Sequence, residues 1–378
     1  LNYIKMGRYE DALGEYKNTI RLDPGFTRAY YRIGVAFLDL KQYKKAIDPL
    51  KQAIRIDPDF KEAHYALGKT YNYLNRYQSA IEPLNQAIRI DSQYAFAHLA
   101  LGLANTKLKQ YDQAVSYLSK AVKLDPSLTE AHSHLGLSFM RVGQFEEAVV
   151  SLNKIETSDP NYADAQSNLG LVLWKLQQYP NAITALKKSI KLRPSLTTSY
   201  ISLGSIYTTL GDNPQAIHYF KEAIESNPKN SEARYNLGLV YEIVGRHQDA
   251  IDEYRAVIRL NPDTPNIYYN LSWALIESRR YVEALASLKN AIRLDPKKTN
   301  AHYSLGWVYG ELKRYEEAIA MLKKVLQLDS NHLGARARLN AMQNHLRKIS
   351  AQKQNPPSAS TSLFKAFNHG KPEIIISP

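Results

Sequence analysis

The chain of 378 residues contains no cysteine. This absence excludes disulfide bonds, a cysteine nucleophile and thiolate metal ligands. No run of 18 or more apolar residues occurs, so the sequence predicts no membrane-spanning helix. A glycine-rich phosphate loop, a Gly-x-Ser-x-Gly elbow and a His-Glu-x-x-His zinc pair are also missing. We therefore expect a protein that is not an enzyme and that needs no cofactor.

What the sequence does contain is a period of 34 residues. Alanine keeps this spacing without a slip at Ala12, Ala46, Ala80, Ala114, Ala148, Ala182, Ala216, Ala250, Ala284 and Ala318. Glycine follows the same period at Gly34, Gly68, Gly102, Gly136, Gly170, Gly204, Gly238 and Gly306, with Ser272 as the one departure. A fixed period of this length predicts an array of similar two-helix units rather than a globule around one active site.

One unit illustrates the expected fold of each repeat. Apolar residues at helical spacing predict a first helix over residues 61–74 and a second over 77–90. Asn75 lies between them and tolerates a left-handed backbone. The same slot holds glycine in other units, at Gly7, Gly143, Gly211 and Gly245. Pro49 and Pro83 fall inside predicted second helices, where we expect a local kink or a late helix start.

These positions resemble those of the tetratricopeptide repeat (TPR) family over residues 1–332. The resemblance implies an all-α fold, a right-handed α-solenoid superhelix of tandem 34-residue helix-turn-helix repeats. It also implies that the first helix of each repeat lines a concave groove and that the second covers the convex side. The family's usual tryptophan at the fourth position is replaced here, by Tyr30, His64, His98, His132 and Tyr200 among others.

The repeat register divides the chain into four predicted parts. Residues 1–26 form a partial repeat, and residues 27–332 hold nine complete repeats. Residues 333–349 are expected to form a C-terminal capping helix, and residues 350–378 a disordered tail. Because the chain opens in the middle of a first helix, we expect it to be a piece of a longer protein.

The net charge of +13 raises the possibility of a basic surface that binds nucleic acid. Residues 1–128 hold 19 basic and 13 acidic side chains, residues 129–264 hold 13 and 15, and residues 265–378 hold 17 and 8. Since the middle of the array is not basic, we do not expect a uniform track for phosphates. A short basic ladder at one groove register, formed by Lys107, Arg141 and Lys175, is a secondary candidate surface for a partner.

Histidine recurs at one register, at His64, His98 and His132, with His302 further along. Equivalent positions in adjacent repeats should lie about 10 Å apart, the spacing of packed helices. Zinc needs each nitrogen within about 2.1 Å of one ion. We therefore expect these histidines to be structural and no metal to be bound.

Aromatic and amide side chains gather on the predicted groove face of the later repeats. The register places Tyr235, Tyr269 and Tyr303 in one row, Trp273 and Trp307 one turn further along, and Asn236 and Asn270 beside them. Rings next to amides suit an extended main chain, which needs apolar anchors together with hydrogen-bond partners. We interpret this set as a partner-binding groove; the alternative is that the rings only stack between repeats.

We therefore expect a scaffold or adaptor that binds a peptide or helix of a partner protein in its groove, with no small-molecule substrate. One alternative is a regulatory region of a larger enzyme whose catalytic domain precedes Leu1. An interrupted row of groove amides partly resembles the repeat region of the O-linked N-acetylglucosamine transferases. Nucleic-acid binding is a second alternative. Self-association through the uncapped N-terminal face or the apolar tail is a third.

Overall fold

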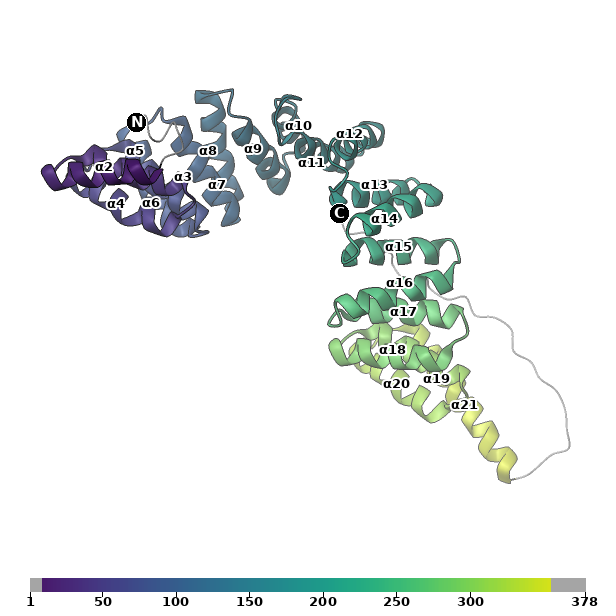
Figure 1. Cartoon of the computed structure of the whole chain (residues 1–378). Coiled ribbons are helices and arrows are strands. Elements are labelled where there is room, and N and C mark those ends of the chain that lie inside the picture. Colours follow the sequence, from purple (N-terminus) through teal and green to yellow (C-terminus); the bar gives the residue numbers. More distant parts are fainter. Residues whose placement is uncertain (1–8, 355–378) are drawn as a thin grey trace. The chain divides into compact units, whose positions relative to one another are not determined.

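The computed structural model describes the fold of residues 9–354 (Figure 1). All regular structure in this range is α-helical, which confirms the predicted all-α array of helix pairs. None of these helices has both the length and the apolar character that crossing a bilayer requires. The predictions for residues 1–8 and 355–378, including most of the tail, lie outside the described residues. The chain forms two compact units, 1–193 and 194–378, and each is described by itself.

Between residues 9 and 193 the first unit contains one leading helix followed by five helix pairs. The leading helix is α2 (Tyr9–Leu22). The pairs are α3 (Thr27–Asp39) with α4 (Tyr43–Ile56), α5 (Lys61–Tyr73) with α6 (Tyr77–Ile90), α7 (Ala95–Lys107) with α8 (Tyr111–Leu124), α9 (Thr129–Val142) with α10 (Phe145–Leu152), and α11 (Tyr162–Lys175) with α12 (Tyr179–Leu192). The helices predicted over 61–74 and 77–90 are confirmed to within one residue.

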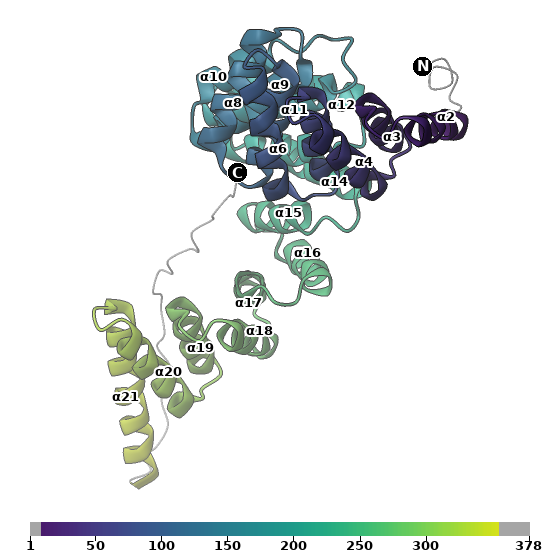
Figure 2. The same cartoon turned by 90° about the vertical axis from the view of Figure 1, so that its left-hand side faces the viewer.

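Between residues 194 and 354 the second unit contains four helix pairs followed by a longer helix. The pairs are α13 (Thr197–Thr209) with α14 (Asn213–Ser226), α15 (Ser231–Ile243) with α16 (His247–Leu260), α17 (Pro265–Glu277) with α18 (Tyr281–Leu294), and α19 (Thr299–Glu311) with α20 (Tyr315–Leu328). The final helix is α21 (Leu333–Gln354). It packs against α20, and Figure 2 shows α19, α20 and α21 as successive layers.

The turn inside each repeat depends on one residue with a left-handed backbone. Asn75 adopts φ 57°, as its position predicts. Its N–H bonds to the Asn72 carbonyl at 3.0 Å, and the next N–H, that of Arg76, bonds to the Tyr71 carbonyl at 2.8 Å. The same conformation recurs at Lys41, Lys109, Gly143, Gln177, Gly211, Gly245, Arg279 and Lys313. The turn therefore keeps its geometry even where a longer side chain replaces glycine or asparagine.

The recurring glycine lets the two helices of a repeat approach closely. A Cβ atom added to Gly68 would lie 2.4 Å from Cγ of Leu84, a leucine with no exposed surface. Six further first-helix glycines make an equally close approach, to Leu50, Leu118, Leu152, Leu186, Phe220 and Tyr254. Ser272 takes the glycine position in α17, where it is fully buried and its hydroxyl donates to the Tyr269 carbonyl at 2.5 Å.

Second helices end in a shared polar turn. At the end of α6, Asp91 is extended and its carboxylate accepts the N–H of Gln93 at 2.9 Å. The same bond, from an Asp or Asn to the N–H two residues on, occurs at Asp57, Asp125, Asn227, Asp295 and Asp329. An Asp or Asn that closes such a turn offers the backbone an alternative to the helix.

The late helix start that we expect at Pro49 and Pro83 is wrong. Helices α4 and α6 begin at Tyr43 and Tyr77, the register of the helices without proline, and continue through both rings. The next residue in each case is a fully buried leucine that packs on the facing glycine. Packing on this side holds the helix together although the proline cannot donate a backbone bond.

Helix α10 is shorter than the other second helices. It spans 8 residues, whereas α8 and α12 span 14. Isolated turns follow, with the Lys154 N–H bonded to the Ser151 carbonyl at 3.2 Å. Thr157 and Ser158 are weak helix formers, and they precede Asp159 and Pro160. The repeat keeps its length while the end of its second helix is replaced by turns.

The end of the second unit is covered by α21. Leu322 and Val325 of α20 are fully buried in a cluster with Ala335, and Leu339 and Met342 pack against it. The helix reaches Gln354, so a disordered tail from residue 350 is predicted too early, because residues 350–354 are helical.

Candidate functional site

The predicted aromatic residues of the second unit lie on its first helices. We call Tyr235, Tyr269, Trp273, Tyr303 and Trp307 the aromatic row; all five side chains are partly exposed. Tyr235 lies on α15, Tyr269 and Trp273 on α17, and Tyr303 and Trp307 on α19. The rings therefore come from three consecutive repeats of one unit.

The two asparagines are placed between repeats rather than on the open face. Asn236 retains 6% of its surface exposed and Asn270 retains 9%. The Asn270 side-chain amide donates to the Tyr235 hydroxyl of the preceding repeat at 3.0 Å. This amide is thus engaged within the protein, and it fixes the first ring of the aromatic row.

Trp273 forms the centre of the aromatic row. Its ring meets that of Tyr269 edge to face, with 6.3 Å between centroids. The Lys298 ammonium lies 5.2 Å from the Tyr269 ring centre, a cation–π distance. Burial raises the pKa of Tyr269, whereas the neighbouring Trp273 and Ser304 side chains lower it.

The C-terminal end of the aromatic row is partly covered. Trp307 packs edge to face on Tyr281, with centroids 5.8 Å apart. The Arg338 guanidinium of α21 lies 5.7 Å from the Trp307 ring and 6.0 Å from that of Tyr303. Tyr303 also contacts His332 at 4.8 Å. The Arg338 guanidinium therefore covers the Trp307 end of the row, and no contact of α21 with Trp273 occurs among the described ring and cation–π contacts.

A partly buried carboxyl group beside the aromatic row was not predicted from the sequence. Glu242 of α15 accepts a hydrogen bond of 2.9 Å from Tyr254, whose side chain is fully buried. Burial, together with the charge of Glu277, raises the pKa of Glu242 to about 7, although the Tyr254 hydroxyl opposes the shift. The available signal was Tyr254 itself, which stands where most repeats have leucine.

The basic ladder lies at the C-terminal ends of three first helices in the first unit. Lys107, Arg141 and Lys175 are exposed and belong to α7, α9 and α11. None of the three is in an ion pair within residues 10–350. Burial, with a smaller effect of the Lys107 charge, lowers the pKa of the neighbouring His134 to about 4.

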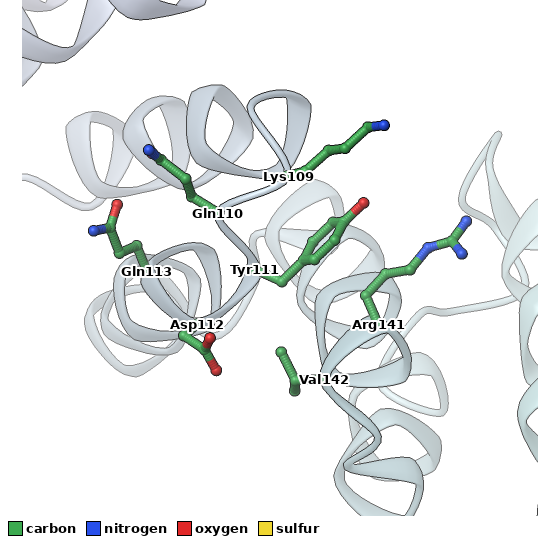
Figure 3. A pocket seen from close by; sticks show the side chains of 7 residues that line it. All are labelled: Lys109, Gln110, Tyr111, Asp112, Gln113, Arg141 and Val142. Atoms are coloured by element: carbon green, nitrogen blue, oxygen red, sulfur yellow. The ribbon is translucent and has the colours of Figure 1, made fainter.

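Arg141 also borders an open pocket of about 500 Å³ (Figure 3). The other lining residues are Lys109, Gln110, Tyr111, Asp112, Gln113 and Val142, from the α7–α8 turn, the start of α8 and the end of α9. Lys109 and Arg141 extend toward the same side as the Tyr111 hydroxyl. Arg141 was predicted from its register, whereas Lys109 belongs to the left-handed turn and has no such signal.

A second aromatic cluster, not predicted, lies on the early repeats. Tyr65 contacts Tyr94 at 5.2 Å and Phe96 at 6.4 Å between ring centroids. The Lys69 ammonium lies 5.8 Å from the Tyr65 ring and 5.7 Å from that of Tyr73. Tyr73 is 49% exposed and Phe96 is 46% exposed. The early repeats therefore also display exposed aromatic rings, although they contain no tryptophan.

The repeated histidines have a structural role. Nε2 of His64 lies 2.9 Å from the Pro58 carbonyl, and His98, His132 and His302 make the same contact six residues back. Arg234 takes this role in α15, bonding to the Pro228 carbonyl at 3.2 Å. Burial lowers the pKa of His98 and His132, although the hydrogen bond to the backbone carbonyl opposes this shift.

Solved structures of other repeat proteins are similar to this chain. The C-terminal part of a TPR repeat-containing protein from Cytophaga hutchinsonii is 17% identical with a TM-score of 0.51, over 64% of this chain and 99% of that one. YrrB, described as a TPR protein with an unusual peptide-binding site, is 23% identical with a TM-score of 0.44, over 49% and 95%. Yeast Tom70 is 14% identical with a TM-score of 0.42, over 94% and 97%. No curated protein matches the chain.

Family models match most of the chain. Models described as tetratricopeptide repeat or TPR repeat cover residues 2–41, 34–72, 68–109, 95–128, 161–229, 202–265, 243–305 and 275–341. These matches span the helix pairs in which glycines pack against second helices and left-handed residues form the turns. The chain belongs to the tetratricopeptide repeat family.

Proposed function

We propose that this protein is a scaffold whose second unit binds an extended segment of a partner protein on the aromatic row. Residues 9–354 consist of helix pairs of one repeat family, an architecture typical of non-enzymatic interaction proteins. The observation that carries the proposal is the partly exposed Trp273 ring, held edge to face by Tyr269. An aromatic ring already fixed in place loses little conformational entropy when a partner covers it.

In this proposal Asn270 orders the Tyr235 ring, and neither Asn236 nor Asn270 meets the partner. Both amides are nearly buried, and Asn270 is bonded to Tyr235. Trp307 contributes a smaller surface because Arg338 lies over it. We therefore expect the main apolar side chain of the partner to pack on Trp273 of α17, the middle of the three first helices that carry the aromatic row.

Charge at the edge of the row favours one class of partner segment. Glu277 and Glu311 end α17 and α19, and both are exposed. A partner with Lys or Arg near its apolar anchor would complement these carboxylates and gain specificity more than affinity. We therefore expect a basic and apolar segment at this site.

The experiment is capture of partners from source lysate by the immobilised protein at low and high salt. Wild type is compared with Trp273→Ala and with Trp174→Ala, a tryptophan of the first unit. Helicity by circular dichroism and affinity for the captured segment are measured for each. We expect the Trp273 variant to lose about 2 kcal/mol of binding, the usual hot-spot scale, with unchanged helicity.

Two outcomes would contradict the proposal. Equal loss of the partner in both tryptophan variants would mean that the aromatic row is not the contact surface. Loss of helicity in the Trp273 variant would mean that the ring is part of the core.

A further inference from the structure

Four cations follow one edge of the first unit and form what we call the basic strip: Lys69, Lys107, Arg141 and Lys175. They come from α5, α7, α9 and α11, the first helices of four consecutive repeats. Lys107, Arg141 and Lys175 lie in the last turns of their helices. Lys69 starts one turn earlier, but its ammonium reaches the ring of Tyr73, which holds the same register as the other three cations.

The helix dipole does not account for the basic strip. A cation in the last turn does stabilise a helix. However, α13, α15, α17 and α19 are equivalent helices of the second unit and have no basic residue there. Helices α17 and α19 even end in Glu277 and Glu311. The fold therefore does not require cations at this edge, and their presence in consecutive repeats needs another reason.

No carboxylate neutralises the strip. None of its four cations forms an ion pair within residues 10–350. The acidic residues of the same helices, Glu62, Glu130 and Asp164, lie in the first turns. Glu130 and Asp164 each lie eleven residues before the cation of their helix, roughly 16 Å at 1.5 Å per residue, which exceeds the Debye length of about 8 Å in physiological salt. Glu62 lies seven residues before Lys69 and forms no ion pair with it. The positive edge is thus available to an external anion.

Aromatic surface borders the first cation of the strip. Tyr73 and Phe96 are about half exposed, and Tyr65 lies beside Lys69. Burial lowers the pKa of Lys69, but the hydroxyls of Tyr65 and Tyr73 raise it by a larger amount. The net shift is upward, so the ammonium stays charged. The strip therefore combines fixed positive charge with apolar surface at one end.

The spacing of the repeats sets the distance between negative charges that a matching ligand must have. Packed helices lie about 10 Å apart. A chain in the polyproline II conformation rises about 3.1 Å per residue and turns once every three residues, so every third side chain returns to the same side after about 9 Å. We propose that the basic strip binds an extended acidic segment of a partner protein that carries Asp or Glu at every third residue.

The inference rests on the proposed scaffold function but concerns a different unit and a partner segment of opposite charge. Trp273 plays no part in it, so the two proposals can fail separately. Arg141 supports it further, because Lys109 extends beside it over the same open pocket (Figure 3).

The test uses the full chain and fluorescence anisotropy with labelled twelve-residue probe peptides. The periodic probe has Glu at every third position among Pro, Ala and Ser; a second probe has the same composition with its glutamates clustered at one end. The strip variant is Lys107→Gln, Arg141→Gln, Lys175→Gln. Its control, Arg89→Gln, Lys123→Gln, Lys191→Gln, removes the same charge from exposed residues in the last turns of α6, α8 and α12.

We expect wild type to bind the periodic probe about tenfold more tightly than the clustered probe, since exposed ion pairs contribute little singly but add up over several repeats. The strip variant should lose this advantage, and the control variant and Trp273→Ala should keep it. Equal affinity for the two probes, or equal loss in the strip and control variants, would overturn the proposal. So would tighter binding of a single-stranded oligonucleotide by the same strip, because the anion would then be nucleic acid.

Discussion

His134 shows how a single partly buried group makes the free energy of unfolding depend on pH. Burial, with Lys107 nearby, holds its pKa at about 4, below the ordinary 6.5. Between these values the unfolded chain binds a proton that the folded protein does not. The contribution of His134 to the free energy of unfolding is therefore fully present above pH 6.5. It falls as the pH drops toward 4, by at most about 3 kcal/mol at roughly 1.4 kcal/mol per pH unit.

The test is His134→Asn, since Asn168 and Asn236 hold the same register in other repeats. Urea unfolding is compared at pH 7.5 and pH 4.5. The variant should lose less stability on acidification than wild type. Other groups with lowered pKa values, among them His98 and His132, contribute to the loss that remains. An identical pH response in both proteins would show that His134 titrates normally.

The contribution of Glu242 to stability changes with pH in the opposite direction. Its pKa is raised to about 7, so between pH 4.5 and 7 the folded protein binds a proton that the unfolded chain does not. Its contribution favours the fold at low pH and is lost as the pH rises through 7. Glu242→Gln keeps an acceptor for Tyr254 but cannot ionise, and it should stabilise the protein by about 1–2 kcal/mol at pH 8. At pH 5 the two proteins should unfold alike; a gain of equal size at both pH values would contradict the assignment.

At the scale of the helix, the contact between the two helices of a repeat depends on the absence of one methyl group. Gly68→Ala would place a Cβ atom 2.4 Å from the buried Leu84, so α5 and α6 must separate. We expect a loss of about 1–3 kcal/mol, typical of overpacking. Gly14→Ala in α2 is the control, because nothing lies within 4 Å of its added Cβ, and the better helix propensity should leave stability equal or higher. Equal losses in a thermal melt would refute this explanation of the repeated glycine.

Replacing a proline inside a helix should stabilise the protein, in contrast to the glycine substitution. Pro49 lies in the interior of α4, where it removes one backbone bond, whereas Pro180 lies in the first turn of α12, where no such bond is lost. Pro49→Ala should therefore stabilise the protein by about 1–2 kcal/mol, and Pro180→Ala should be neutral or slightly destabilising. A destabilised Pro49 variant would mean that packing around the ring contributes more than the missing bond.

The period predicts the helices well because the same packing demands recur in each repeat. The bounds over 61–74 and 77–90, and the left-handed Asn75, follow from local chemistry. The continuation of α4 through Pro49 does not, since burial of the following leucine overrides local preference.

The candidate site is less predictable than the helices. Register alone places Trp273 and Arg141 on first helices, but it does not say that the Asn270 amide is bonded to Tyr235. Nor does it indicate that α21 brings Arg338 over Trp307. Such contacts depend on how a side chain meets a neighbouring repeat, which spacing within one repeat does not describe.

At the scale of the whole molecule, each helix contacts mainly its neighbours in sequence, so the ends of the array need cover. Chain termination after residue 332 would remove α21 and expose Leu322 and Val325, at a cost of about 3–6 kcal/mol for two buried aliphatic side chains. The melting temperature should fall and the molecular mass should become concentration-dependent. Termination after residue 354 keeps α21 and serves as control; a similar fall there would locate the effect in the last residues instead.

The matching faces of the repeats also have a genetic consequence. In the first unit, α4 packs on α5 and α6 packs on α7 through the same register of alanines and leucines. An in-frame deletion of residues 61–94, one full period, would join α4 to α7 across faces that already fit each other. The array could thus gain or lose repeats by unequal recombination while remaining folded. Such an event would remove Lys69 but keep the spacing of Lys107, Arg141 and Lys175. The length of the partner segment that the protein binds could therefore change by one repeat at a time during evolution.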